Sequence, residues 1–210
     1  MSIFLIGFVC FTNLNAQESE NSKLYTSLGY FVSLSAFPVY EEANDVETKI
    51  RQEGVLDFGY SYGFKYNIKN LNDNSSISLN ARPGLGLGWT PGIGFISLRV
   101  PVSAAMNTGV GSTYDTDSDY GFGLDLGLEY LFSPLWKTTD VKERKVISDL
   151  SPFAQISFRY WKTSKNRLHE IFIRANLLGS NDEDLIEKYT DFDTISPFAI
   201  TFGFNRYLNY

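Results

Sequence analysis

Residues 120–132 read Tyr-Gly-Phe-Gly-Leu-Asp-Leu-Gly-Leu-Glu-Tyr-Leu-Phe, so that every second residue is large and apolar or aromatic. This alternation has the period of a β-strand, in which successive side chains point to opposite faces of the sheet. A typical globular strand has about five or six residues, whereas a tilted strand that crosses a bilayer needs roughly nine to eleven. The stretch is therefore predicted to be one long amphipathic strand.

The face opposite the large residues indicates which side of this strand meets lipid. Apart from Leu131, that face carries only glycine and the two acids Asp125 and Glu129. Small residues belong on the inner wall of a narrow barrel, because the interior of about eight strands is barely wide enough for side chains. The large residues are therefore predicted to point outward into lipid.

Composition narrows the class of protein. The chain has 210 residues, which suits one domain, with 20% charged and 43% hydrophobic residues. Beyond the N-terminus no segment approaches the roughly eighteen apolar residues of a membrane helix, which excludes a helical membrane protein. A net charge of -6 argues against a nucleic-acid partner.

The N-terminus has the features of a secretory signal peptide. Residues 1–16 have an apolar centre and end in Ala16 before a polar stretch, which predicts cleavage there, a short tail over 17–23 and a barrel over 24–210. The alternative is a retained, buried N-terminal strand. Cys10 is the only cysteine, so cleavage would remove disulfides, thiol catalysis and cysteine-based metal sites from consideration.

The same alternation recurs along the chain. Eight segments show it, and they cover residues 24–37, 55–66, 76–89, 93–107, 120–132, 153–161, 169–178 and 198–210. The predicted fold is all-β: a closed, antiparallel, eight-stranded, up-and-down transmembrane β-barrel.

The connections between these segments are uneven in length. Long loops are expected at 38–53, 133–151 and 179–196, a turn at 67–75 and a tight turn at 89–92, where an outer-membrane barrel would have a long loop. Pro83 and Pro101 cannot donate a ladder hydrogen bond, so a bulge or a locally broken ladder is expected at each.

With these segments, a signal peptide and a terminal aromatic residue, the chain resembles the small outer-membrane β-barrel proteins of Gram-negative bacteria, of the OmpA-domain and OmpX kind. Its Gly- and aromatic-rich strands look most like those of Bacteroidota. In that family the last strand ends in an aromatic residue that the barrel-assembly machinery reads as an insertion signal. The resemblance implies this role for Phe202, Phe204, Leu208 and Tyr210, while Arg206 departs from the pattern.

Charged residues also fall at inward positions of the predicted strands. The set comprises Asp57, Lys65, Arg82, Arg99, Asp125, Glu129, Arg159, Glu170 and Arg174. Buried charges need partners, so an ion-paired, hydrogen-bonded and largely closed lumen is predicted, with Asp125 and Glu129 meeting Arg82, Arg99 or Arg159. A narrow or gated ion path is the alternative.

Aromatic residues lie toward the ends of the predicted strands, as interfacial girdles require. They are Tyr60, Tyr62, Tyr66, Trp89, Tyr130, Tyr160, Trp161 and Tyr207. A stacking platform for a sugar or a nucleic acid is the alternative interpretation.

Three weaker patterns carry no catalytic, cofactor or metal prediction. Asp115, Asp117 and Asp119 are spaced like the start of an EF-hand, but the Gly and Glu that complete such a loop are missing. His169, the only histidine, could be paired with Ser157 or Ser164, yet no nucleophile motif is present. The acidic residues at 182–193 could bind divalent cations that bridge lipopolysaccharide phosphates, or a partner protein.

We expect a non-enzymatic protein of the cell outer membrane that acts through its extracellular loops in surface contact, in envelope integrity or as an accessory subunit. The expected partners are outer-membrane lipid and lipopolysaccharide, the barrel-assembly machinery during insertion, and a larger outer-membrane protein complex. The alternatives are a secreted, soluble, lipocalin-like barrel with its aromatic face inward around an apolar ligand, a narrow ion channel, and a lipid-modifying barrel hydrolase.

Overall fold

The computed structural model describes residues 24–43, 46–90, 93–114, 116–137, 145–162, 167–176 and 199–210. Side chains are described for these residues apart from 36–43, 46–54, 90, 93, 133–137 and 145–149. The signal peptide and tail predicted over 1–23, and the loop predicted at 179–196, lie outside the described residues.

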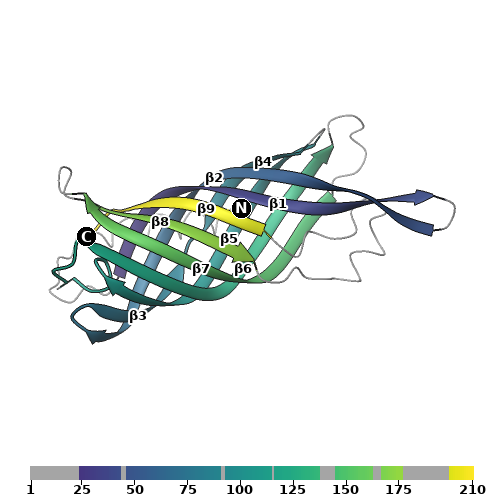
Figure 1. The fold of residues 1–210 in the computed structure, drawn as a ribbon. Coiled ribbons are helices and arrows are strands. Elements are labelled where there is room, and N and C mark those ends of the chain that lie inside the picture. The colour runs from purple at the N-terminus through teal and green to yellow at the C-terminus, as the bar shows by residue number, and fades with distance from the viewer. Residues whose placement is uncertain are drawn as a thin grey trace, which may run out of the picture.

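The described residues form nine strands (Figure 1). They are β1 (Leu24–Ala43), β2 (Val46–Asn72), β3 (Ser75–Ala81), β4 (Gly84–Thr90), β5 (Ile93–Gly109), β6 (Tyr120–Lys137), β7 (Lys145–Lys162), β8 (Arg167–Asn176) and β9 (Ala199–Tyr207). The described residues contain no helix long and apolar enough to cross a membrane, a finding that concerns helices alone.

The strands close into a ring because β1 pairs on one side with β2 and on the other with β9. From β9 the antiparallel order continues through β8, β7, β6 and β5, and β3 and β4 together occupy the place between β5 and β2. The ring therefore has eight positions filled by nine strands, which confirms the all-β, antiparallel, eight-stranded barrel.

The division between β3 and β4 falls at Pro83. The chain continues across this break, where the Arg82 amide donates to the carbonyl of Pro101 at 3.0 Å and the Tyr62 amide donates to the carbonyl of Pro83 at 2.9 Å. Pro101 stays in register with Glu129 of β6, so the ladder breaks only on the side of β3 and β4. The two prolines thus share one break instead of causing two.

Two of the predicted loops are wrong. Residues 38–53 continue β1 and β2 as a paired hairpin up to Ala43 and Val46, with a shift of register between Val39 and Tyr40. Within 133–151, β6 runs to Lys137 and β7 begins at Lys145, and their ladder reaches the pair Leu135 and Lys145. The charged composition of these segments is typical of loops. Backbone hydrogen bonds do not depend on side-chain charge, so the ladders continue through both segments.

The structure also locates two predicted turns and the end of the last strand. The turn expected at 67–75 is only two residues long, because β2 runs to Asn72 and β3 begins at Ser75. The last strand ends at Tyr207, earlier than the predicted 210. The tight turn at 89–92 is confirmed by the pairing of Thr90 with Ile93.

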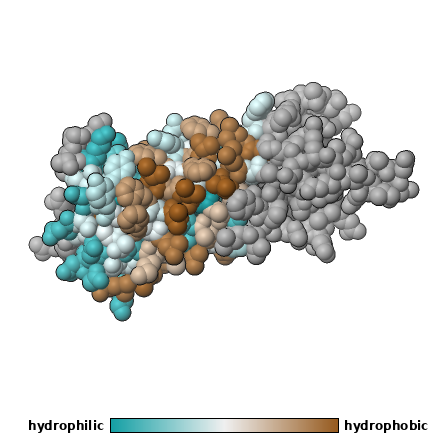
Figure 2. Space-filling view, in the orientation of Figure 1, coloured by the Kyte–Doolittle hydropathy of each residue, from teal (hydrophilic) through white to brown (hydrophobic). Residues whose placement is uncertain are grey.

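The wall is apolar outside and polar inside. Leu85, Leu87 and Trp89 on β4 are 62–69% exposed on the outside, and Leu124, Leu126 and Leu128 on β6 are at least half exposed. Figure 2 shows hydrophobic residues gathered over the middle of the visible face and hydrophilic residues toward the end where the chain terminates. The lipocalin-like alternative, which requires the aromatic face inward, is therefore wrong.

We call the end that holds the β2–β3 and β5–β6 turns and the last residues of the chain the C-terminal end of the barrel. Here Gly109 has φ +73°, and a Cβ on it would lie 2.0 Å from the carbonyl oxygen of Tyr120. A left-handed backbone and an adjacent backbone oxygen both exclude a side chain at this position.

Replacing Gly109 by alanine is expected to lower the free energy of unfolding by at least about 1–2 kcal/mol, because alanine pays the left-handed penalty and meets the backbone of β6. Gly94→Ala is the control, since a Cβ there has nothing within 4 Å. Urea unfolding of the refolded protein in detergent micelles measures both. Equal stabilities of the two variants would contradict the prediction.

Candidate functional site

The candidate site is the interior of the barrel. Because side chains alternate along each strand, one parity of every strand faces this lumen. The nine charged residues expected there are all buried, with exposed fractions of 7% or less. They come from β2, from the break after β3, and from β5, β6, β7 and β8.

The largest group of charges is built on Glu129 of β6. Its carboxylate accepts a hydrogen bond from Arg99 Nη1 at 2.9 Å and a second from Arg174 Nη1, so one acid bridges two arginines. Arg99 also contacts Asp57 Oδ2 through Nε at 2.8 Å, and Ser97 Oγ donates to the same oxygen at 2.8 Å. Four charges from β2, β5, β6 and β8 are thereby connected across the lumen.

A second group surrounds Glu170 of β8. Arg82 Nη2 lies 2.7 Å from Glu170 Oε1, and Asn205 Nδ2 donates to the same oxygen at 2.9 Å. The hydroxyl of Tyr207 donates to Glu170 Oε2 at 2.9 Å. This carboxylate thus joins the β3–β4 break to β8 and β9.

Aromatic rings complete the surroundings of the arginines. The guanidinium of Arg174 lies 4.7 Å from the ring centroid of Phe153, and that of Arg82 lies 5.1 Å from the ring of Phe172. Such cation–π contacts suit arginine, whose planar and weakly hydrated guanidinium tolerates removal from water.

Asp125 does not form the expected contact with an arginine. It accepts hydrogen bonds from Asn80 Nδ2 at 2.7 Å and from Ser103 Oγ at 3.0 Å. Of the two acids on β6, Glu129 therefore joins the arginines, whereas Asp125 is held by neutral donors.

Lys65 and Arg159 donate hydrogen bonds to the backbone of the β5–β6 turn. Both donate to the carbonyl oxygen of Gly111, Arg159 at 3.1 Å, and Arg159 also donates to Asn107 Oδ1 at 2.9 Å. Gly111 has φ +74°, and its Cβ position is occupied by Leu168 at 2.8 Å. A glycine is thus needed where the turn presents this carbonyl to two cations.

The turn itself is buried at the C-terminal end of the barrel. We call residues 110–114 the turn plug; Val110, Ser112 and Thr113 in it are 0–3% exposed. Asn67 and Ser76 donate to the carbonyl of Ser112 at 2.6 and 2.7 Å. The plug is therefore fixed to β2 and β3.

Aromatic residues from both ends of the chain pack against the turn plug. Tyr114 stacks on Tyr25 with ring centroids 4.5 Å apart and on Tyr210 at 5.4 Å. The hydroxyl of Tyr210 donates to the carbonyl of Thr113 at 2.8 Å and accepts from the Gly111 amide at 3.2 Å. Sequence reasoning missed this plug, although the glycines at 109 and 111 were a signal that a tight turn occurs there.

Most of the expected girdle residues lie on the outer wall, where Tyr60, Tyr66 and Trp89 are 64%, 48% and 65% exposed. Tyr130 is 39% exposed, and Tyr62 and Tyr160 are half-buried. Trp161 is a correction, because it packs against the buried cluster that contains Tyr25 and Leu168 instead of lying on the outer wall. Tyr207 is a correction: it is 5% exposed and lies inside the lumen, because its position has the inward parity of β9.

The four residues of the expected insertion signal do not share one environment. Phe202 and Leu208 are 45% and 44% exposed, and Phe204 is half-buried against Tyr30. Tyr210 follows the end of β9 and packs on the turn plug.

The weaker patterns do not assemble into a site. His169 stacks on Tyr160 of the outer wall at 5.4 Å, whereas Ser157 is buried at an inward position, so the strand wall separates them. Asp117 and Asp119 are exposed, and Asp115 and Ser164 lie outside the described residues. No group of three or more potential metal ligands occurs within the part of the chain that the structure describes.

This fold is that of small outer-membrane β-barrels. The crystal structure of Neisserial surface protein A superposes with a TM-score of 0.51 at 10% identity, covering 90% of this chain and 98% of that one. The outer membrane protein OprG from Pseudomonas aeruginosa gives 0.53 at 13% identity, covering 90% and 97%. No family model matches the sequence, and no curated protein matches it either. At these identities the likeness establishes the fold alone.

Replacing Glu129 by glutamine is expected to lower the free energy of unfolding by about 3–5 kcal/mol, because two buried arginines lose the charge they share. The exposed acid Asp119 offers the matched control, and Asp119→Asn should change stability by no more than about 0.5 kcal/mol. Adding Arg174→Met to Glu129→Gln should recover part of the loss. Urea titration in micelles measures all three, and a neutral Glu129→Gln would refute the shared-charge interpretation.

Proposed function

We propose that the protein is a non-enzymatic barrel of the cell outer membrane with a closed lumen, which acts through the end opposite the C-terminal end. The observation that carries the proposal is the inverted polarity of the wall. Large apolar residues cover the outside while nine charged side chains lie within. Water would penalise such an exterior, whereas a bilayer favours it.

The orientation of the barrel follows from the lengths of its connections. Outer-membrane barrels place short turns in the periplasm and long connections outside. At the C-terminal end the β2–β3 and β7–β8 connections are short, and the long β8–β9 connection lies at the opposite end, which supports a periplasmic location for the C-terminal end. The tight β4–β5 turn, also at the opposite end, departs from this pattern. The β1–β2 hairpin then faces outward, and Figure 1 shows it extending beyond the other strands.

The protruding hairpins are the parts best suited to surface contact. β1 and β2 pair over eight residues beyond Ser35, where the pairing of β1 with β9 stops. Two strands held by backbone bonds present a defined surface farther from the membrane than a loop of equal length. Contact with lipopolysaccharide or with a larger outer-membrane complex through this surface, together with handling by the barrel-assembly machinery, belongs to the proposal.

The turn plug and the ion pairs above it support the proposal of a closed lumen. Carbonyls of the plug bind Lys65 and Arg159, and Arg82, Arg99 and Arg174 each meet an acid. An ion that crosses the barrel would have to separate these buried partners, at a high energetic cost.

Fractionation and conductance together test the proposal. We expect the protein in the outer-membrane fraction, with a shift on gels between boiled and unboiled samples, and no stable conductance from purified protein in a planar bilayer. Recovery in the soluble periplasmic fraction without a gel shift would refute the membrane location. A large, steady conductance would refute the closed lumen while leaving the location intact.

A charge on the outer wall should be penalised according to its depth. Leu126→Arg, near the middle of β6, is expected to cost about 2–4 kcal/mol, because the bilayer midplane disfavours a guanidinium. Ile68→Arg, near the C-terminal end of β2, should cost at most about 1 kcal/mol. Both residues are outward-facing and exposed. Urea unfolding in lipid vesicles compares them, and equal costs would contradict a membrane-embedded wall.

A further inference from the structure

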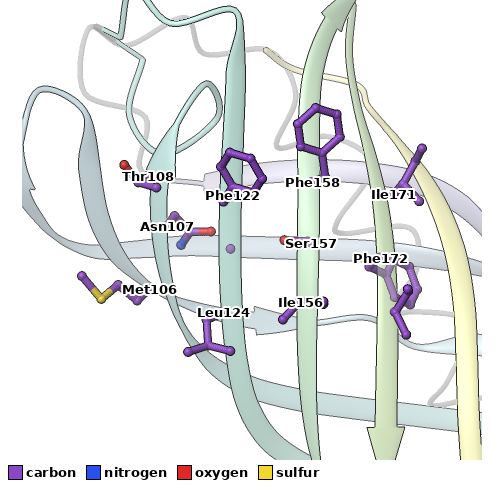
Figure 3. A pocket seen from close by; sticks show the side chains of 12 residues that line it. Met106, Asn107, Thr108, Phe122, Leu124, Ile156, Ser157, Phe158, Ile171 and Phe172 are labelled. Atoms are coloured by element: carbon purple, nitrogen blue, oxygen red, sulfur yellow. The ribbon is translucent and has the colours of Figure 1, made fainter.

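The outer wall is hollowed across β5, β6, β7 and β8. Here a groove of about 510 Å³ runs between exposed apolar side chains, of which Figure 3 labels Met106, Leu124, Ile156 and Ile171. These four residues are 48–60% exposed. The volume lies within the range of about 300–1,000 Å³ that is usual for ligand sites.

An aromatic row borders the groove on the side of the C-terminal end. Tyr120 stacks on Phe158 at 5.9 Å, Phe158 on Tyr160 at 6.1 Å, and Tyr160 on His169 at 5.4 Å. Amphipathic rings of this kind are typical of the level where acyl chains meet polar headgroups. The row therefore marks the polar border of the groove.

Cations lie at and beyond this border. Arg206 of β9 pairs in register with His169 of β8. Lys162 of β7 pairs with Arg167 of β8, which lies nearer the C-terminal end of the barrel than His169. At about 3.3 Å per residue, the pair Lys162 and Arg167 lies roughly 13 Å along the strands from Ile171, which lines the groove. Lys165 falls in the same β7–β8 connection by sequence.

The exposed acids in this region lie in the β5–β6 connection and not on the strands that carry the cations. Asp117 and Asp119 are exposed on the connection that leads into β6, and the carbonyl of Asp119 accepts from the Trp161 amide at 3.0 Å. The strand ends of β7, β8 and β9 therefore present three cations at outward positions against these two acids of the neighbouring connection.

We propose that this groove binds one anionic phospholipid of the periplasmic leaflet. An acyl chain lies in the groove, and the phosphate is held by Lys162, Arg167 and Arg206. An apolar groove alone would accept any hydrocarbon. The cations beyond its polar border add the charge complementarity that selects a negatively charged headgroup. This inference rests on the proposed location of the protein in the outer membrane.

Native mass spectrometry of the folded protein, released from vesicles of equal phosphatidylglycerol and phosphatidylethanolamine, tests the proposal. We expect retention of phosphatidylglycerol over phosphatidylethanolamine by at least about fivefold, since one cation near an anionic lipid surface contributes about that factor. Lys162→Gln combined with Arg167→Gln should abolish most of this preference. Lys69→Gln, an exposed cation of β2 at the same end, should leave it unchanged.

The apolar part of the site is tested by filling the groove. Ile156→Trp should reduce retention of both lipids severalfold, whereas Leu87→Trp on the exposed face of β4 should not. Equal retention of the two lipids by the wild type, or unaltered retention in both the charge and the groove variants, would overturn the proposal. A dimer that Ile156→Trp dissociates would overturn it too, by giving the groove to a second copy.

The gel shift between boiled and unboiled samples distinguishes a failure of the proposed function from a failure of the proposed lipid site. A variant or wild type that fails to shift has not formed the barrel in lipid, which counts against the proposed function. A protein that shifts but shows no preference for phosphatidylglycerol keeps the proposed function and loses the lipid site.

Discussion

The pairing of β1 with both β2 and β9 is the constraint on which the rest of the structure depends. It joins the first strand to the last over nine residue pairs and leaves no free edge in the ring. In a bilayer every strand N–H and C=O must find its partner within the protein, so an open edge would be too costly. Closure also fixes which parity of each strand is enclosed. Every inward side chain must then fit a space that only eight strand positions surround.

That narrow interior explains the arrangement of charge. Long cationic side chains fill it, and they are accommodated because small residues on neighbouring strands and in the turn plug leave room. A Cβ on Gly111 would lie 3.2 Å from Arg159 Cδ, and one on Gly63 would lie 3.6 Å from Arg82 Cγ. Each arginine removed from water then requires several acceptors at once. Glu129 and Glu170, from adjacent parts of the ring, supply them to Arg99, Arg174 and Arg82. The network thus links strands that are not neighbours and supplements the backbone ladder with contacts across the lumen.

The strand period predicted the barrel and the inward positions, because a period of two residues assigns parity without knowledge of neighbours. The predictions failed where residue type was given precedence over parity, and where the ladder continues beyond the alternating pattern. Tyr207 was assigned to a girdle on residue type, although it has the inward parity that puts its hydroxyl on Glu170. Residues 38–53 of the β1–β2 hairpin were predicted as a loop because charged residues replace the alternating pattern there. The register between strands brings Glu129, and not Asp125, to the arginines. This register depends on how the strands are staggered around the closed ring. No single segment of the sequence encodes that stagger.

The turn plug shows how the end of the barrel and the middle of the chain depend on each other. Its buried carbonyls receive donors from β2, β3 and β7, and its aromatic partners come from the first strand and from the last residue. Tyr210 stacks on Tyr25 and Tyr114 at the place where β9 pairs with β1, so the plug and the closure of the ring share these contacts. Lys65 and Arg159 gain their shared acceptor at Gly111 only when the plug is in place. Closure of the wall and packing of the turn plug are therefore coupled, and the aromatic residue expected to direct insertion is, in the finished barrel, one of the residues that hold the plug.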